Sequence, residues 1–172
     1  MMLSFLTMSR RTLILLAGLG SLALFLGALG FQYWVGLLPC TMCLWQRWPH
    51  RIAIGLAIVG VAIPHAVITW LGALSMVVNA GIALLHTGVE RAWWQGPQVC
   101  GANAAQDLGG LSMEDLFDTT TGPTIVLCTD VAWMFAGLSM ASWNGIFSLV
   151  LAAVWIMAAR RKATAEQTSP PG

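Results

Sequence analysis

The sequence predicts an all-α membrane protein, a bundle of four transmembrane helices with a long outer loop between the third and fourth helices. Hydrophobic residues fill 58% of its 172 positions and charged residues only 9%, whereas soluble domains are about half apolar and a quarter charged. Four segments are also long and apolar enough, or nearly so, to cross a hydrocarbon core of about 30 Å. They run approximately over residues 12–33, 48–63, 67–85 and 143–159, within one domain spanning residues 1–172.

The first segment carries no charge and is rich in Leu, Ala and Gly, so we expect a helix that packs through small residues. Two arginines before it and the sequence Ala28-Leu29-Gly30, which loosely fits a small-residue cleavage site, also allow a cleaved signal peptide. Its apolar run is longer than the core of a usual signal peptide, which favours a membrane span. The second and fourth segments are short, and Trp48 and Trp143 provide interfacial anchors for them.

Basic residues are sorted to the two ends of the chain. Arg10 and Arg11 precede the first segment, and residues 160–162 are all basic. By the positive-inside rule both termini are then cytoplasmic, including the tail 160–172. The connections 34–47 and 88–140 face outward, and six of the seven acidic residues lie in the longer one. The net charge of +1 gives no indication of nucleic-acid binding.

All four cysteines lie in the two outward connections, as the pairs Cys40/Cys43 and Cys100/Cys128. An even number of cysteines outside the cytoplasm indicates an oxidising compartment. A two-residue spacer makes a poor staple, because closing so short a loop removes little chain entropy. It makes a good redox pair, since dithiol and disulfide interconvert with little backbone motion. We therefore predict redox chemistry, while static disulfides in a structural membrane protein stay open as an alternative.

A zinc site is a further alternative, because two Cys-x-x-Cys pairs would favour one. Here only Cys40 and Cys43 have that spacing. Cys100 and Cys128 are separated by 27 residues and no histidine accompanies them. We therefore predict no metal.

Arg47 and Arg51 lie at the outer end of the second segment, against the positive-inside bias. If the helix begins near Cys43, Arg47 follows one turn later on the same face, and both the helix N-terminus and the guanidinium favour a thiolate on Cys43. Pro49 leaves the register open. Snorkelling of Arg47 to lipid phosphates is the alternative.

The motif Pro-Cys-x-x-Cys-x-x-Gln-Arg that begins at Pro39, with a second cysteine pair in a long outer loop, resembles the DsbB family of membrane thiol:quinone oxidoreductases. The similarity extends to His-Thr-Gly-Val-Glu at 86–90 and Gly-Leu-Ser-Met at 137–140, and so covers nearly the whole chain. It implies a disulfide-forming enzyme of the bacterial inner membrane, with its redox loops in the periplasm.

The resemblance also implies roles for individual residues. Cys40/Cys43 would pass electrons to a membrane quinone, either ubiquinone or menaquinone, and Arg47 would help to hold it. Cys100/Cys128 would reoxidise a soluble thioredoxin-fold partner of the DsbA type, with Cys100 facing the partner. A relative dedicated to one client is an alternative within the family.

His86 and Glu90 lie at the outer end of the third segment. His86 could hydrogen-bond a quinone oxygen or merely cap its helix, and both interpretations stay open. Glu90 follows four residues later and could orient His86 or pair with Arg91. We expect Glu90 to be a surface charge.

Overall fold

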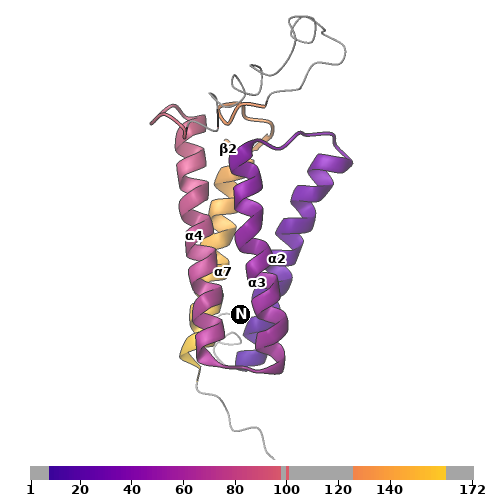
Figure 1. The fold of residues 1–172 in the computed structure, drawn as a ribbon, viewed down its shortest axis with the longest axis vertical. Coiled ribbons are helices and arrows are strands. Elements are labelled where there is room, and N and C mark those ends of the chain that lie inside the picture. The colour runs from indigo at the N-terminus through magenta and orange to yellow at the C-terminus, as the bar shows by residue number, and fades with distance from the viewer. Residues whose placement is uncertain (1–7, 98–99, 101–125, 162–172) are drawn as a thin grey trace, which may run out of the picture.

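The structure is a computed structural model that describes residues 8–97, 100 and 126–161. Four long helices dominate it, which confirms the predicted helical bundle (Figure 1). They are α2 (Arg10–Tyr33), α3 (Thr41–Ala62), α4 (Ala66–Glu90) and α7 (Met140–Arg160), and a short hairpin of β1 (Met134–Phe135) and β2 (Leu138–Ser139) precedes α7.

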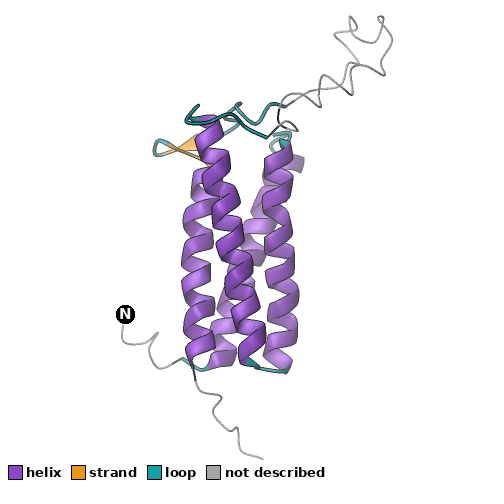
Figure 2. Cartoon of the chain, turned by 60° about the vertical axis from the view of Figure 1, so that its left-hand side comes forward, coloured by secondary structure: helices purple, strands orange, loops and turns teal. Residues whose placement is uncertain are grey.

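Successive helices run in opposite directions (Figures 1 and 2). α4 packs along α7, and α2 packs against both α3 and α7. The beginning of α2 and the end of α7 lie at one end of the bundle, which we call the termini end. The α2–α3 connection and the segment before α7 lie at the other, which we call the cysteine end.

The ends of three helices differ from those predicted from the sequence. α3 begins at Thr41 and not near residue 48, so residues 41–47 are helical and not part of a loop. The reason is an unusual N-cap, because the Cys40 sulfur accepts a hydrogen bond from the Cys43 backbone N–H at 3.2 Å. α4 continues to Glu90, beyond the expected end at 85, and α7 begins at Met140 and not at 143. Of the predicted loop 88–140 and tail 160–172, residues 98–99, 101–125 and 162–172 lie outside the described part.

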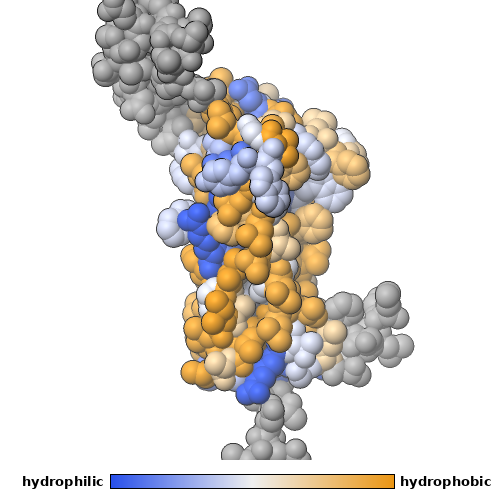
Figure 3. Space-filling view, turned by 90° about the vertical axis from the view of Figure 1, so that its right-hand side faces the viewer, coloured by the Kyte–Doolittle hydropathy of each residue, from blue (hydrophilic) through white to orange (hydrophobic). Residues whose placement is uncertain are grey.

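The protein is a multi-pass membrane protein. Of the described helices, α2, α4 and α7 are long and apolar enough to cross a membrane. α3 falls below this level because its first half carries Gln46, Arg47, His50 and Arg51. Hydrophobic side chains dominate the face shown in Figure 3, and large exposed ones such as Leu19, Ile58 and Leu149 suit contact with lipid.

The hydrophobic core fills the half of the bundle near the termini end, and Trp155 of α7 is its largest fully buried side chain. Gly72 of α4 makes room for this ring: a Cβ added there would lie 2.5 Å from a ring carbon of Trp155. Helices in membranes associate closely where small residues face bulky ones. Gly72 is therefore a packing residue.

Gly72→Ala should destabilise the bundle by about 1–3 kcal/mol, because the rigid indole has to move. Gly81 lies on the same helix, and a Cβ there would meet nothing within 4 Å. Gly81→Ala is thus the matched control, expected to be neutral or stabilising by up to about 1 kcal/mol. Denaturant unfolding in detergent measures both. Equal midpoints for the two variants would contradict the packing role of Gly72.

One side chain joins three segments at the termini end. The Arg10 guanidinium donates to the Ala158 carbonyl at 3.1 Å and to the Pro64 carbonyl at 2.8 Å, and it also donates to the Arg161 carbonyl. It thereby connects the start of α2 with the α3–α4 turn and the end of α7. The carbonyl ends of helices carry partial negative charge, so a cation is favourable at this position.

Candidate functional site

The two cysteine pairs meet at the cysteine end of the bundle. Cys40 caps α3, while Cys100 and Cys128 form a disulfide. Cys40 and Cys128 are both buried in one apolar cluster with Met42 and Val89, and Cys43 and Cys100 pack against this cluster. Segments distant in sequence are thus assembled into one four-sulfur site.

The Cys40 sulfur has two polar side-chain neighbours. It lies 2.8 Å from the Cys43 sulfur and 3.5 Å from Nε2 of His86. The hydrogen bond with the Cys43 thiol, followed by that with His86, lowers the pKa of Cys40 from 9.0 to about 4 against the opposing effect of burial. The favoured thiolate is therefore Cys40, whereas the sequence argument had placed it on Cys43. That argument used the helix N-terminus and Arg47 but could not include the capping role of Cys40 or the approach of His86.

The Cys40 and Cys43 sulfurs are also close enough to form a disulfide with little motion. A bond of about 2.05 Å requires them to approach by less than ~1 Å from their present separation of 2.8 Å. Among the described residues, Cys40, Cys43 and His86 are the one group of possible metal ligands whose atoms all lie within 4.8 Å of one another.

His86 lies behind Cys40 and is only 2% exposed. Its Nδ1 is 3.1 Å from the Gln46 side-chain nitrogen, and its Nε2 is 3.8 Å from a Glu90 carboxylate oxygen. Glu90 also accepts a hydrogen bond from the Ser139 hydroxyl, and its side chain is 7% exposed. The expectation that Glu90 is a surface charge is therefore wrong, because the end of α4 is covered by the β2–α7 junction.

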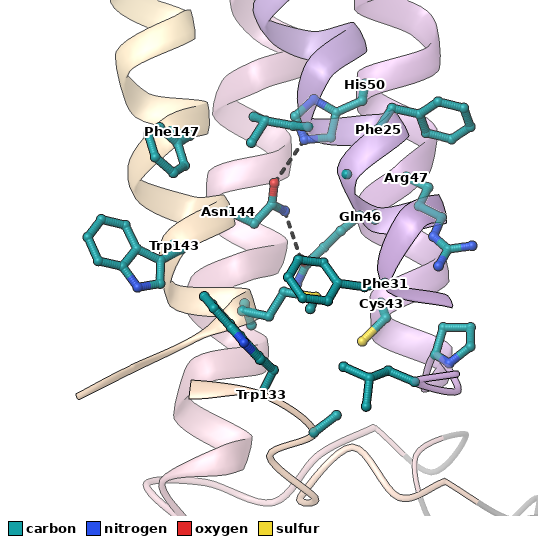
Figure 4. Close-up of a pocket in the computed structure, with 18 of the residues that line it drawn as sticks. Phe25, Phe31, Cys43, Gln46, Arg47, His50, Trp133, Trp143, Asn144 and Phe147 are labelled. Atoms are coloured by element: carbon teal, nitrogen blue, oxygen red, sulfur yellow. Dashed lines mark hydrogen bonds between the residues drawn. The ribbon is translucent and has the colours of Figure 1, made fainter. Parts of the chain in front are cut away.

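A cavity of about 460 Å³ opens beside the cysteines, between α2, α3, α7 and residues 132–135 (Figure 4). Its walls are mainly apolar. Aromatic rings from three segments contact one another in series along it, with centroid separations between 5.3 and 6.2 Å. In order of contact they are Phe31, Trp133, Phe135, Trp143 and Phe147.

The cavity has a small set of polar side chains: Cys43, Gln46, Arg47 and His50 from α3, and Asn144 from α7. Arg47 is 9% exposed and donates to the Gln32 side-chain oxygen of α2 at 2.6 Å. It thus faces another helix and the cavity. Arg51, one turn later, lies outside the cavity lining and 5.0 Å from the ring centroids of both Phe25 and Trp48.

Of the residues singled out from the sequence, the structure brings Cys43 and Arg47 to the cavity and both cysteine pairs to one cluster. His86 is not among the residues that line the cavity. Sequence reasoning gave no role to three polar residues of the lining, Gln46, His50 and Asn144. A signal existed for the first two, because positions 43, 46, 47 and 50 share one helical face once the helix begins at Thr41.

The fold and the site together define a class of protein, namely helical membrane bundles in which two cysteine pairs lie next to each other. The family model described as "Disulfide bond formation protein DsbB" matches residues 10–158. The chain belongs to this family and is a disulfide-forming oxidoreductase.

Similar proteins carry the name disulfide bond formation protein B. One from Aromatoleum aromaticum is 32% identical over 164 residues, covering 84% of this chain and 91% of the relative. One from Shewanella sp. strain MR-4 is 31% identical over 138 residues, covering 78% of each chain. One from Polaromonas sp. is 27% identical over 169 residues, covering 95% of this chain and 98% of the relative. No solved structure matches the chain significantly.

Proposed function

We propose that the chain passes electrons from a soluble DsbA-type thiol oxidase, through Cys100/Cys128 and then Cys40/Cys43, to a membrane quinone. One observation carries this proposal: the same four-sulfur site has the buried Cys40 against the loop disulfide and Cys43 in the wall of an apolar cavity. One pair thus forms the loop disulfide, and the other borders the cavity. This placement supports electron transfer from the loop pair to Cys40/Cys43 and then to the cavity.

The first exchange takes place at the loop disulfide. A thiolate of the reduced partner attacks the Cys100 sulfur, and Cys128 leaves. The partner's second thiol then displaces Cys100, so that the partner departs as a disulfide and the loop pair is left as a dithiol. Exposure favours this order, since Cys128 is 1% exposed and Cys100 is more accessible.

The second exchange joins the two pairs. The Cys128 thiolate attacks the Cys40 sulfur of the oxidised Cys40–Cys43 pair, and Cys43 leaves. Cys100 then displaces Cys40, which restores the loop disulfide and leaves Cys40/Cys43 reduced. Thiols of low pKa leave faster, and the low pKa of Cys40 favours this release. In this proposal His86 acts on Cys40 and not on the quinone.

The cavity residues fit a quinone. The volume is within the usual range for small-molecule sites, and aromatic walls suit a flat ring. When bound, a quinone takes up the two electrons and two protons that the Cys40/Cys43 dithiol releases, giving a disulfide and a quinol. Arg47 would hold an oxygen of the ring and stabilise negative charge there, while the aromatic walls exclude water from Cys43.

The sidedness of the protein follows from the same proposal. Arg10, Arg160 and Arg161 all lie at the termini end, which we place in the cytoplasm of a bacterial inner membrane. The cysteine end then faces the periplasm, where disulfides persist and the partner is soluble.

The proposal predicts that purified protein with a reduced DsbA-type partner will bleach ubiquinone or menaquinone absorbance catalytically. Arg47→Ala should weaken the apparent quinone affinity about tenfold or more, because a charge-assisted contact of about 1.5–3 kcal/mol is lost. Arg51→Ala is the matched control on the same helix and should behave as the wild type.

Quinone that is not consumed, with no thiol exchange with any thioredoxin-fold partner, would instead support static disulfides in a structural membrane protein. Exchange with one client protein alone would indicate a dedicated relative of the family.

A further inference from the structure

Asn144 is the one polar side chain that α7 contributes to the cavity lining, and it lies across from the polar face of α3 (Figure 4). Its amide is held on both sides. The nitrogen donates to the Gln46 side-chain oxygen at 2.8 Å, and the oxygen lies 2.9 Å from Nε2 of His50. Two partners on α3 therefore fix the plane of an amide that belongs to another helix.

Asn144 and Gln46 each retain hydrogen-bonding capacity after these contacts are made. A primary amide has two N–H donors. The Asn144 nitrogen contacts only Gln46, and the Gln46 nitrogen contacts only His86, among the described residues. If the oxygen and nitrogen of both side-chain amides are interchanged, the donors and acceptors between His86, Gln46, Asn144 and His50 are reversed. One N–H on each amide nitrogen is still left without a partner. In an apolar cavity within a membrane, an unpaired N–H is costly and favours an acceptor oxygen on a bound molecule.

Arg47 and Asn144 are thus two separate donor positions, on different helices, that border the same apolar space. A para-quinone carries two acceptor oxygens on opposite sides of one ring and no donor of its own. We propose that Asn144 is a second quinone-binding residue, whose amide N–H donates to one ring oxygen while the Arg47 guanidinium donates to the other. The inference rests on the proposed quinone reduction and adds to it the residue that orients the ring between α3 and α7.

The competing explanation is that Asn144 only joins helices. Polar side chains in membrane bundles often do so, and the chain offers a direct comparison. Asn79 of α4 is also a buried amide, at 0% exposure, and it also contacts His50 Nε2, at 3.0 Å, and Ser148, at 2.8 Å. It is not among the residues that line the cavity. Asn79→Leu thus removes a helix-joining amide of the same cluster that does not itself line the cavity, and leaves the Asn144 contacts with Gln46 and His50 available.

The test is quinone binding at equilibrium with both cysteine pairs oxidised, so that no electron transfer accompanies it. Trp133 and Trp143 line the cavity, and quenching of tryptophan fluorescence by a short-chain ubiquinone reports its occupancy. Asn144→Leu should weaken binding about three- to tenfold, as expected for the loss of one neutral hydrogen bond. Asn79→Leu should bind as tightly as the wild type, and Asn144→Gln, which keeps an amide N–H, should regain most of the affinity.

Infrared spectroscopy of the bound quinone gives an independent measurement that also works on the wild type alone. We expect both quinone carbonyl bands to be shifted from their positions in an apolar solvent. One band should return to its unshifted position in Asn144→Leu, and the other should return in Arg47→Ala. The inference is overturned if Asn144→Leu binds as the wild type does, if Asn79→Leu is equally impaired, or if one wild-type carbonyl band is unshifted. If the wild type shows no saturable quinone binding, both the proposed function and the role of Asn144 are overturned. If the wild type binds quinone but one of the three results above is found, only the role of Asn144 is overturned.

Discussion

Cys43→Ser should abolish quinone reduction, lowering turnover by several orders of magnitude to the uncatalysed background. Without the Cys43 sulfur no disulfide can form with Cys40, and no thiol remains in the cavity wall to deliver electrons. A serine hydroxyl can still donate to Cys40, so the environment of that thiolate is preserved. Stopped-flow absorbance of the quinone, with reduced partner in excess, measures the loss.

The same variant should still react once at the loop. One equivalent of reduced partner should be oxidised by Cys100–Cys128, because that disulfide forms independently of Cys43. Counting partner disulfide per protein molecule provides the control. A Cys43→Ser protein that continues to reduce quinone would show that the electrons leave by another route.

Cys128→Ser should convert the partner-oxidising reaction into a dead end. Cys100 is then the remaining loop thiol, and the buried thiol that would normally displace the partner is gone. A partner that lacks its own resolving cysteine, supplied as an activated disulfide, should form a stable mixed disulfide with Cys100. A non-reducing gel should show nearly complete conversion to the adduct, compared with little or none for the wild type.

Cys100→Ser is the reciprocal control for this experiment. Cys128 is almost fully buried against Cys40 and Val89, so a bulky partner should not reach it. Adduct formation by Cys100→Ser at the rate of Cys128→Ser would contradict the assignment of Cys100 as the partner-facing sulfur.

The sequence was sufficient to predict the four helices, because long apolar runs in a chain with so few charges have no other stable arrangement. It also singled out all four cysteines and Arg47. It could not supply the neighbours of each sulfur, since contact between Cys40 and Cys128 depends on how the α3 start and the segment before α7 pack. The spacing of each pair contains no information on that packing.

Most of the errors arise at the start of α3. Cysteine is not among the preferred N-cap residues and Pro49 left the register open, so the predicted connection extended over residues 34–47. With residue 46 in a predicted loop, Gln46 and His50 did not share a helical face. There was therefore no reason in the sequence to connect Asn144 with either residue. Glu90 was misjudged for a related reason, because only the folded β2–α7 junction covers it.

The Arg10 contacts described above make the bundle mechanically asymmetric. One guanidinium joins α2, the α3–α4 turn and α7 at the termini end, whereas at the cysteine end α2 leans away from α3 (Figure 1). The bundle therefore resembles a wedge with a fixed apex. Both α2 and α3 line the cavity, so the position of α2 relative to α3 at the cysteine end sets the width of the cavity, while the Arg10 contacts hold the other end of α2 in place.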